Sequence, residues 1–393
     1  MPESFICSKL QCNHNAAAQQ FGRLSDQVAV LDLPVSLTIC DVEGYMLRSC
    51  WTTTAIVLFL PMFAASAQDN SQPDPLFASD EIIDVEIEAP FGLLASERPD
   101  DEEVAGKFRY TADDGSLVEF DVAVRTRGRL RRTKEVCQFP PLRLNFKKSE
   151  VKGSLFDKQD RLKVVTHCRK QARYEQAIIS EYLAYRIFNL LSDASYRVRL
   201  LRATYTYSDE ERQVQSYAIF IEHKDRVGKR LNAKTLQIEK SMIQDLRRPD
   251  LNLASVFQYF ISNTDFSPIE SAPGEDCCHN QTIFALEGGP NYTIPYDFDQ
   301  SGLVNAPHAL PNPRFKLRST RVRLYRGRCV NNGYLPATLK LFNDKRDDIE
   351  ALVRSQQELT KGTAKLMLAF IKKFYDTINT PKRLHREIVK KCI

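Results

Sequence analysis

Two carboxylates, Asp297 and Asp299, stand one residue apart in the last third of the chain. They follow Tyr292, Ile294 and Tyr296, whose alternation predicts a strand that would place both carboxylates on one side of the backbone. Like charges held this close repel each other unless a cation or a proton lies between them. The spacing therefore predicts a divalent-metal site.

Two residues earlier in the chain, Asp265 and Asn280, have side chains that suit the same kind of site. Asp265 follows a predicted helix, and a carboxylate in such a loop is placed to accept a proton from an attacking hydroxyl. Asn280 offers an amide oxygen, and Mg²⁺ prefers oxygen ligands. Protein kinases use a base Asp, an Asn ligand and a metal-binding Asp in this order. The plainer alternatives are that Asp265 caps a turn, that Asn280 is an ordinary loop residue, and that His279 beside it is a polar loop member instead of a ligand or proton donor.

The elements that must position these residues follow from periodicity. The first part of the chain is β-rich, and the period-two patterns predict strands at 82–88, 107–111, 116–125, 142–146, 162–165, 197–207 and 214–222. Apolar residues at three- and four-residue steps predict a helix over 174–191. A second helix is expected at 251–262, a hairpin at 281–286 and 292–297, and mainly helices over 335–393.

Several of these segments resemble the CotH family of atypical secreted kinases, first associated with bacterial spore coats. The matching segments are V-R-T-R-G at 124–128, P-L-R-L-N-F at 141–146, L-K-V-V-T at 162–166, residues 177–190, 197–207 and 217–222, and I-P-Y-D-F-D at 294–299. They occur in the family's order and cover about 120–305.

The resemblance implies an α+β, two-lobed protein-kinase-like fold, with a β-rich lobe at 81–225 that holds one helix and a C-terminal lobe at 226–393. It implies binding of ATP with Mg²⁺ or Mn²⁺ and phosphorylation of a protein acceptor. Asp265 matches the catalytic aspartate, Asn280 and Asp297 match the metal ligands, and Asp299 supports them or a second metal.

The nucleotide side is expected around an Arg- and Gly-containing loop, to which Arg125, Arg127 and Gly128 correspond; Arg129 stands where the family usually has a second glycine. Candidate phosphate-binding cations are Arg143 and Lys163, and their candidate ion-pair partners are Glu181 and Glu222. The arginines at 125, 127, 129 and 131 would share one face if the strand continued, either to hold phosphates or an acidic substrate or simply as a solvated face.

The N-terminal region predicts export. After Met46 come a short basic stretch, an apolar run at 54–64 and a small-residue cleavage site ending at Ala67. The run is shorter than the ~20 residues of a membrane span. We expect a leader at 1–67, with Met46 a candidate start, a polar linker at 68–80, and an extracytoplasmic mature protein without a stable membrane span. The net charge of +5 over 393 residues argues against a nucleic-acid partner.

The cysteines agree with export. Six follow the predicted leader, at 137, 168, 277, 278, 329 and 392, and an even number in an exported chain favours disulfides over buried free thiols. The adjacent Cys277 and Cys278 are expected to bond distant partners, one of them Cys329. Cys168 and the neighbouring His167 are expected in packing or a disulfide.

These observations predict an exported CotH-like kinase that transfers phosphate from ATP to a hydroxyl acceptor. Two alternatives stay open. One is a secreted binding or structural protein that kept the fold and lost phosphotransfer. The other is a glycosyl-transfer enzyme that uses the D-x-D pair on metal and a sugar nucleotide.

Overall fold

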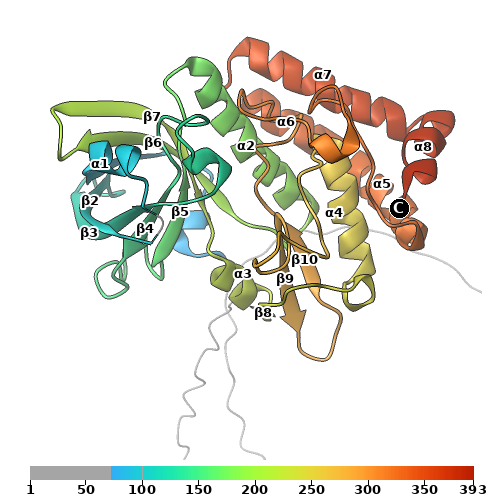
Figure 1. Ribbon diagram of the computed structural model, residues 1–393, viewed down its shortest axis with the longest axis horizontal. Helices are drawn as coiled ribbons and strands as arrows, with labels where there is room; N and C mark the ends of the chain where they lie inside the picture. The colour runs from blue at the N-terminus through green and yellow to red at the C-terminus, as the bar shows by residue number, and fades with distance from the viewer. Residues whose placement is uncertain (1–71, 100) are drawn as a thin grey trace, which may run out of the picture. The chain divides into compact units, whose positions relative to one another are not determined.

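The computed structural model describes residues 72–99 and 101–393, which form a β-barrel followed by a mostly helical part (Figure 1). All of them belong to one compact unit of the chain, Ser66–Ile393. The predicted α+β class is confirmed. The predicted leader at 1–67, and the linker residues up to 71, lie outside the described residues.

Seven strands close the barrel in the order β1-β2-β3-β4-β5-β7-β6. Neighbouring strands are antiparallel except β1 and β6, which pair in parallel with Ile83 opposite Leu201. Closure leaves no unpaired strand edge. The strands are β1 (Ile83–Ala89), β2 (Val104–Thr111), β3 (Leu117–Thr126), β4 (Leu142–Phe146), β5 (Arg161–Val165), β6 (Val198–Tyr207) and β7 (Arg212–Ile221), with the short helix α1 (Phe91–Ser96) after β1.

The barrel core is aromatic. Phe108 packs against Phe156, with ring centroids 4.8 Å apart, and both side chains are fully buried. Leu76 and Phe77, in a 3₁₀ turn at Pro75–Phe77, belong to the same core. The C-terminal half of the predicted linker at 68–80 therefore contributes two buried apolar side chains to the barrel core.

Helix α2 (Ala172–Leu191) contacts β6 and β7 and lies between the barrel and the C-terminal helices (Figure 1). It is buried on nearly all sides, so its apolar residues join one core with the barrel strands and the helices beyond. Those helices are α4 (Arg248–Ile261), α5 (Leu335–Asp344), α6 (Arg346–Ser355), α7 (Lys361–Ile378) and α8 (Pro381–Glu387).

A small second sheet is flanked by the loops that contain Asn280 and Asp297. Its order is β10-β9-β8, with β8 (Ala233–Thr235), β9 (Gln281–Leu286) and β10 (Tyr292–Pro295), and α3 (Lys224–Arg230) precedes it. The predicted hairpin is confirmed, with Tyr292 opposite Phe284. Its second strand ends at Pro295, two residues before Asp297.

The six cysteines of the described residues form three disulfides: Cys137–Cys168, Cys277–Cys278 and Cys329–Cys392. The predicted disulfides are present, but the predicted partners of Cys277 and Cys278 are wrong. Cys329 lies beside Cys392 because Ile393 forms backbone hydrogen bonds to Gly327 and Cys329, 2.9 and 3.1 Å long. Among the described residues, no helix is both long and apolar enough to cross a bilayer.

Candidate functional site

Asp265 lies in the loop after α4, held by its neighbours. Its backbone N–H donates to the side chain of Asn263 over 2.9 Å. Asn280 Nδ2 donates to the Asp265 carbonyl over 2.7 Å and to its carboxylate Oδ2 over 3.1 Å. His279 Nε2 lies 2.9 Å from the other oxygen, Oδ1, and this hydrogen bond raises the pKa of His279. Asp265, His279 and Asn280 therefore form one cluster.

A tight turn holds Asn280 in place. Cys278 and Gln281 exchange backbone hydrogen bonds, both 3.2 Å long, around His279 and Asn280. Asn280 adopts a left-handed conformation with φ +53°, an arrangement that non-glycine residues seldom take and that is common at functional sites. The Asn280 carbonyl accepts from the backbone N–H of Tyr296 over 3.1 Å, so the turn is tied to the end of β10.

Asp297 follows Tyr296 directly and is also left-handed, with φ +61°. Its backbone N–H donates to the hydroxyl of Tyr185 on α2 over 2.8 Å. Burial and the charge of Asp299 raise the pKa of Asp297 to about 6, although Arg127 opposes the shift. The expectation that Asp297 and Asp299 share a strand face is wrong, because the strand has ended before them.

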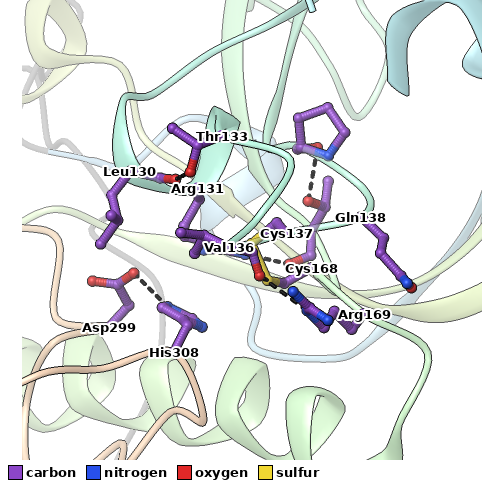
Figure 2. Close-up of a disulfide and its surroundings, with 12 residues drawn as sticks. Leu130, Arg131, Thr133, Val136, Cys137, Gln138, Cys168, Arg169, Asp299 and His308 are labelled. Atoms are coloured by element: carbon purple, nitrogen blue, oxygen red, sulfur yellow. Dashed lines mark hydrogen bonds and ion pairs between the residues drawn. A yellow bond between two sulfur atoms is a disulfide. The ribbon is translucent and has the colours of Figure 1, made fainter. Parts of the chain in front are cut away.

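Asp299 has its own partner. Its Oδ2 lies 2.9 Å from Nε2 of His308, and both side chains are buried (Figure 2). Burial alone would raise the pKa of Asp299, but His308 and the guanidinium of Arg131 outweigh it and lower the pKa. The contact with His308 occupies Oδ2 of Asp299, and the charge of Asp299 disfavours the ionised form of Asp297.

The cations face this acidic group from the barrel. Arg125, Arg143 and Lys163 are register neighbours across β3, β4 and β5. The Lys163 ammonium lies 5.1 Å from the ring centroid of Tyr296. Burial first, and then the charge of Arg127, lower the pKa of Lys163 to about 7. Arg125 pairs with Asp101 over 3.3 Å, and Lys163 is the member of the three that lines the same cavity as Asp297.

The predicted Arg–Gly loop is not a continuing strand. β3 ends at Thr126, and Gly128 is left-handed with φ +83°. Arg129 is exposed and pairs with Glu275, whereas Arg131 is buried. The four alternating arginines therefore do not share one face, because the chain turns at Gly128.

The two candidate glutamates have different surroundings. Glu222 pairs with Arg230 over 2.9 Å, so it is not available to Arg143 or Lys163. Glu181 on α2 lies 3.9 Å from Nη1 of Arg131, and burial, followed by the charge of Asp299, raises the pKa of Glu181 well above its usual range.

Some of the groups described above line a cavity of about 60 Å³. Its lining includes the cations Arg127 and Lys163, the acids Glu181 and Asp297, and the ring of Tyr296. Small-molecule sites usually enclose ~300–1,000 Å³. The cavity therefore has room for a group of the size of a phosphate, and a whole nucleotide would have to extend beyond it.

Sequence patterns missed three side chains that build this site: Tyr185, His308 and Arg131 as a buried cation. Tyr185 reads as a core position of the α2 periodicity, and only its hydroxyl distinguishes it from an apolar residue. His308 is nine residues beyond Asp299 in an irregular loop, where nothing in the local pattern marks it.

The donor set fits a metal that arrives with phosphates. The described residues contain no group of three or more His, Cys, Asp or Glu side chains arranged to hold a metal ion. The Asn280 amide nitrogen points to Asp265, and no donor in the described chain bonds its Oδ1. Mg²⁺ usually takes one or two protein ligands plus phosphate oxygens and waters. Asn280 Oδ1 and the Asp297 carboxylate match that requirement.

No family model matches this sequence, and no curated protein or solved structure matches it either.

Proposed function

We propose that this protein is a metal-dependent phosphotransferase of the CotH-like kinase type, with the barrel and the helical part as the two lobes of a kinase-like fold. The observation that supports it best is the chain of contacts from Asp265 through Asn280 to the end of β10, where Asp297 faces Lys163 and Arg127. The order of base, amide ligand and carboxylate ligand is that of protein kinases.

In the proposed reaction, the oxygen of an acceptor hydroxyl forms a bond to the γ-phosphorus of ATP. The bond between that phosphorus and the oxygen bridging to the β-phosphate breaks, and ADP leaves with the electron pair. The hydroxyl proton passes to the Asp265 carboxylate, which His279 and Asn280 hold in one orientation.

The basic side chains have a different task. Lys163 and Arg127 line the cavity opposite Asp297, where phosphate oxygens would replace Asp297 as their nearest anions. Asn280 and Asp297 would hold Mg²⁺ or Mn²⁺, which supplies charge neutralisation to the phosphates. Positioning and electrostatics account for most of the rate in this class of reaction.

The three disulfides support an extracytoplasmic location for this activity, because disulfides persist in oxidising compartments. ATP as the phosphate donor in such a compartment is part of the proposal. Transfer from a sugar nucleotide in place of ATP would favour the glycosyl-transfer alternative.

The test is transfer of labelled γ-phosphate by the purified protein with Mg²⁺ or Mn²⁺, to itself or to a Ser-containing peptide. We expect Asp265→Asn to lower the transfer rate by ~10²–10⁴-fold, as for the loss of a general base. The matched control is Asp276→Asn, an exposed carboxylate in the same loop.

Equal labelling by Asp265→Asn would exclude Asp265 as the base. If ATP with metal produces no shift in the melting temperature, the protein is a binding or structural protein with the same fold. Transfer from a sugar nucleotide alone would establish the glycosyl-transfer alternative.

A further inference from the structure

A second cavity, of about 490 Å³, opens beside Asp265. Thr264 and Phe266, on either side of Asp265, line it, and so does His279, which is hydrogen-bonded to the Asp265 carboxylate. This volume falls within the ~300–1,000 Å³ of ordinary ligand sites. A group bound here would reach the Asp265 carboxylate from the side of His279.

Arg326 shapes the wall of this cavity. Its Nη1 donates to the carbonyls of Thr264 and Phe266, 2.9 and 2.7 Å away. Its guanidinium lies 4.6 Å from the ring centroid of Phe266 and 4.7 Å from that of Phe315. These contacts make Arg326 part of the cavity wall, where it fixes the backbone on both sides of Asp265.

Two further arginines, Arg314 and Arg328, line the cavity without an ion-pair partner among the described residues. Burial and then the charges of Arg314 and Arg328 lower the pKa of Arg326 to about 10, so the three guanidiniums are close enough to feel one another. Glu270 is the acidic side chain in the lining.

Three guanidinium groups and one side-chain carboxylate in the lining leave an excess of positive charge, which favours an anionic ligand. Guanidinium groups bind carboxylates through paired hydrogen bonds, and the aromatic rings of Phe266 and Phe315 offer an apolar surface beside them. This combination fits a peptide with acidic side chains. A basic segment would meet Arg314 and Arg328 unfavourably.

We propose that this cavity binds an acidic peptide segment that carries the acceptor serine or threonine, with Arg314 and Arg328 holding its carboxylates. This inference rests on the proposed phosphotransferase function. The segment's hydroxyl oxygen would form the new bond to the γ-phosphorus, its proton would pass to Asp265, and ADP would leave with the electrons of the broken bridging bond.

The test separates binding from transfer. A fluorescent peptide with one serine flanked by Asp and Glu is compared with an otherwise identical peptide that carries Asn and Gln. Binding to the full chain is measured by fluorescence anisotropy, and transfer with labelled ATP and Mg²⁺. We expect the acidic peptide to bind at least ~10-fold more tightly than the amide peptide, with an affinity that falls as salt is added.

The variant is Arg314→Gln with Arg328→Gln, and the matched control is Arg318→Gln, an exposed arginine on the same segment outside the cavity. The double variant should lose ~10-fold or more of the affinity for the acidic peptide and keep its melting temperature. The control should bind as the unmodified protein does.

Equal affinity for the two peptides, or undiminished binding by the double variant, would overturn the proposal. Displacement of the acidic peptide by an equally charged oligonucleotide with higher affinity would also overturn it, because the site would then recognise charge and not a peptide. Binding that depends on Arg314 and Arg328 without any phosphate transfer would contradict the proposed function and leave the acidic-segment site standing.

Discussion

Asp297 and Lys163 both line the small cavity, and the surroundings of each disfavour its charged form. Burial raises the pKa of Asp297 to about 6 and lowers that of Lys163 to about 7. Each group therefore changes charge close to neutral pH, which is typical of sites that bind or transfer charge. A phosphate with its metal would bring a cation to Asp297 and an anion to Lys163.

Substitution of Asp297 should separate stability from function. A raised pKa means that the folded protein holds this proton more tightly than the unfolded chain does. Stability therefore falls as the pH rises from about 3.8 to about 6, and the loss persists above that range. We expect Asp297→Asn to be more stable than the unmodified protein at pH 8, by up to ~3 kcal/mol in unfolding free energy measured by urea denaturation, and this difference to shrink at acidic pH. The variant should lose the stabilisation that Mg²⁺ with ATP gives.

The control for this prediction is Asp113→Asn, on an exposed hairpin turn, which should leave both measurements unchanged. A variant at Asp297 that is less stable than the unmodified protein at pH 8, or that keeps its metal-dependent stabilisation, would contradict the assignment of Asp297 as a ligand.

At the scale of elements, helix α2 connects the barrel to the acidic loop. Glu181 and Tyr185 lie one turn apart on this helix, a spacing that places both on the same face. Glu181 lines the small cavity, and the Tyr185 hydroxyl holds the backbone of Asp297. A shift of α2 would move both contacts together, so the helix sets the position of Asp297 relative to the cations of β5.

Tyr185→Phe should test this positioning role. It removes the acceptor of a hydrogen bond, and a buried N–H left without a partner costs about 1–3 kcal/mol. We expect that loss in urea denaturation together with a drop of about tenfold or more in metal-dependent transfer. Tyr375→Phe is the matched control, because that buried hydroxyl donates to the Phe342 carbonyl over 3.0 Å in the helical part. The control should lose similar stability and keep its activity.

Local patterns predicted most of the elements, since alternation and helical spacing depend only on neighbours in sequence. They predicted the helix that became α2 and the hairpin of β9 and β10. They did not predict that β1 would pair in parallel with β6, because no local signal says which of several distant strands closes a barrel.

The sequence indicated which residue types to examine as a candidate site, but it did not indicate which of them would be in contact. Asn280 is hydrogen-bonded to Asp265 and to the backbone of Tyr296, the residue before Asp297, yet the shared strand face of Asp297 and Asp299 did not form. A left-handed residue such as Asp297 depends on a distant partner, here Tyr185 on another element. The pairing of Cys277 with Cys278 likewise depends on how one turn folds, which their spacing alone does not specify.

At the scale of the whole molecule, one disulfide constrains the barrel and its connection to α2, and another constrains the C-terminal helices. Cys137–Cys168 joins the loop after β3 to the segment that leads from β5 into α2, close to the Asp299–His308 pair (Figure 2). Cys329–Cys392 spans 63 positions and encloses α5, α6, α7 and α8 in one covalent loop. Closing a loop of this length reduces the entropy of the unfolded chain, by roughly 4 kcal/mol in the loop-entropy treatment.

Replacing both Cys329 and Cys392 with Ser should therefore lower the unfolding free energy by roughly 2–4 kcal/mol under oxidising conditions. The measurement is urea denaturation with and without a reductant. Reductant should bring the unmodified protein toward the variant, because it opens the same loop. Arg328 precedes Cys329 directly, so the variant should also bind the acidic peptide more weakly than the unmodified protein. Equal stability of the two proteins without reductant would show that this bond does not constrain the C-terminal helices.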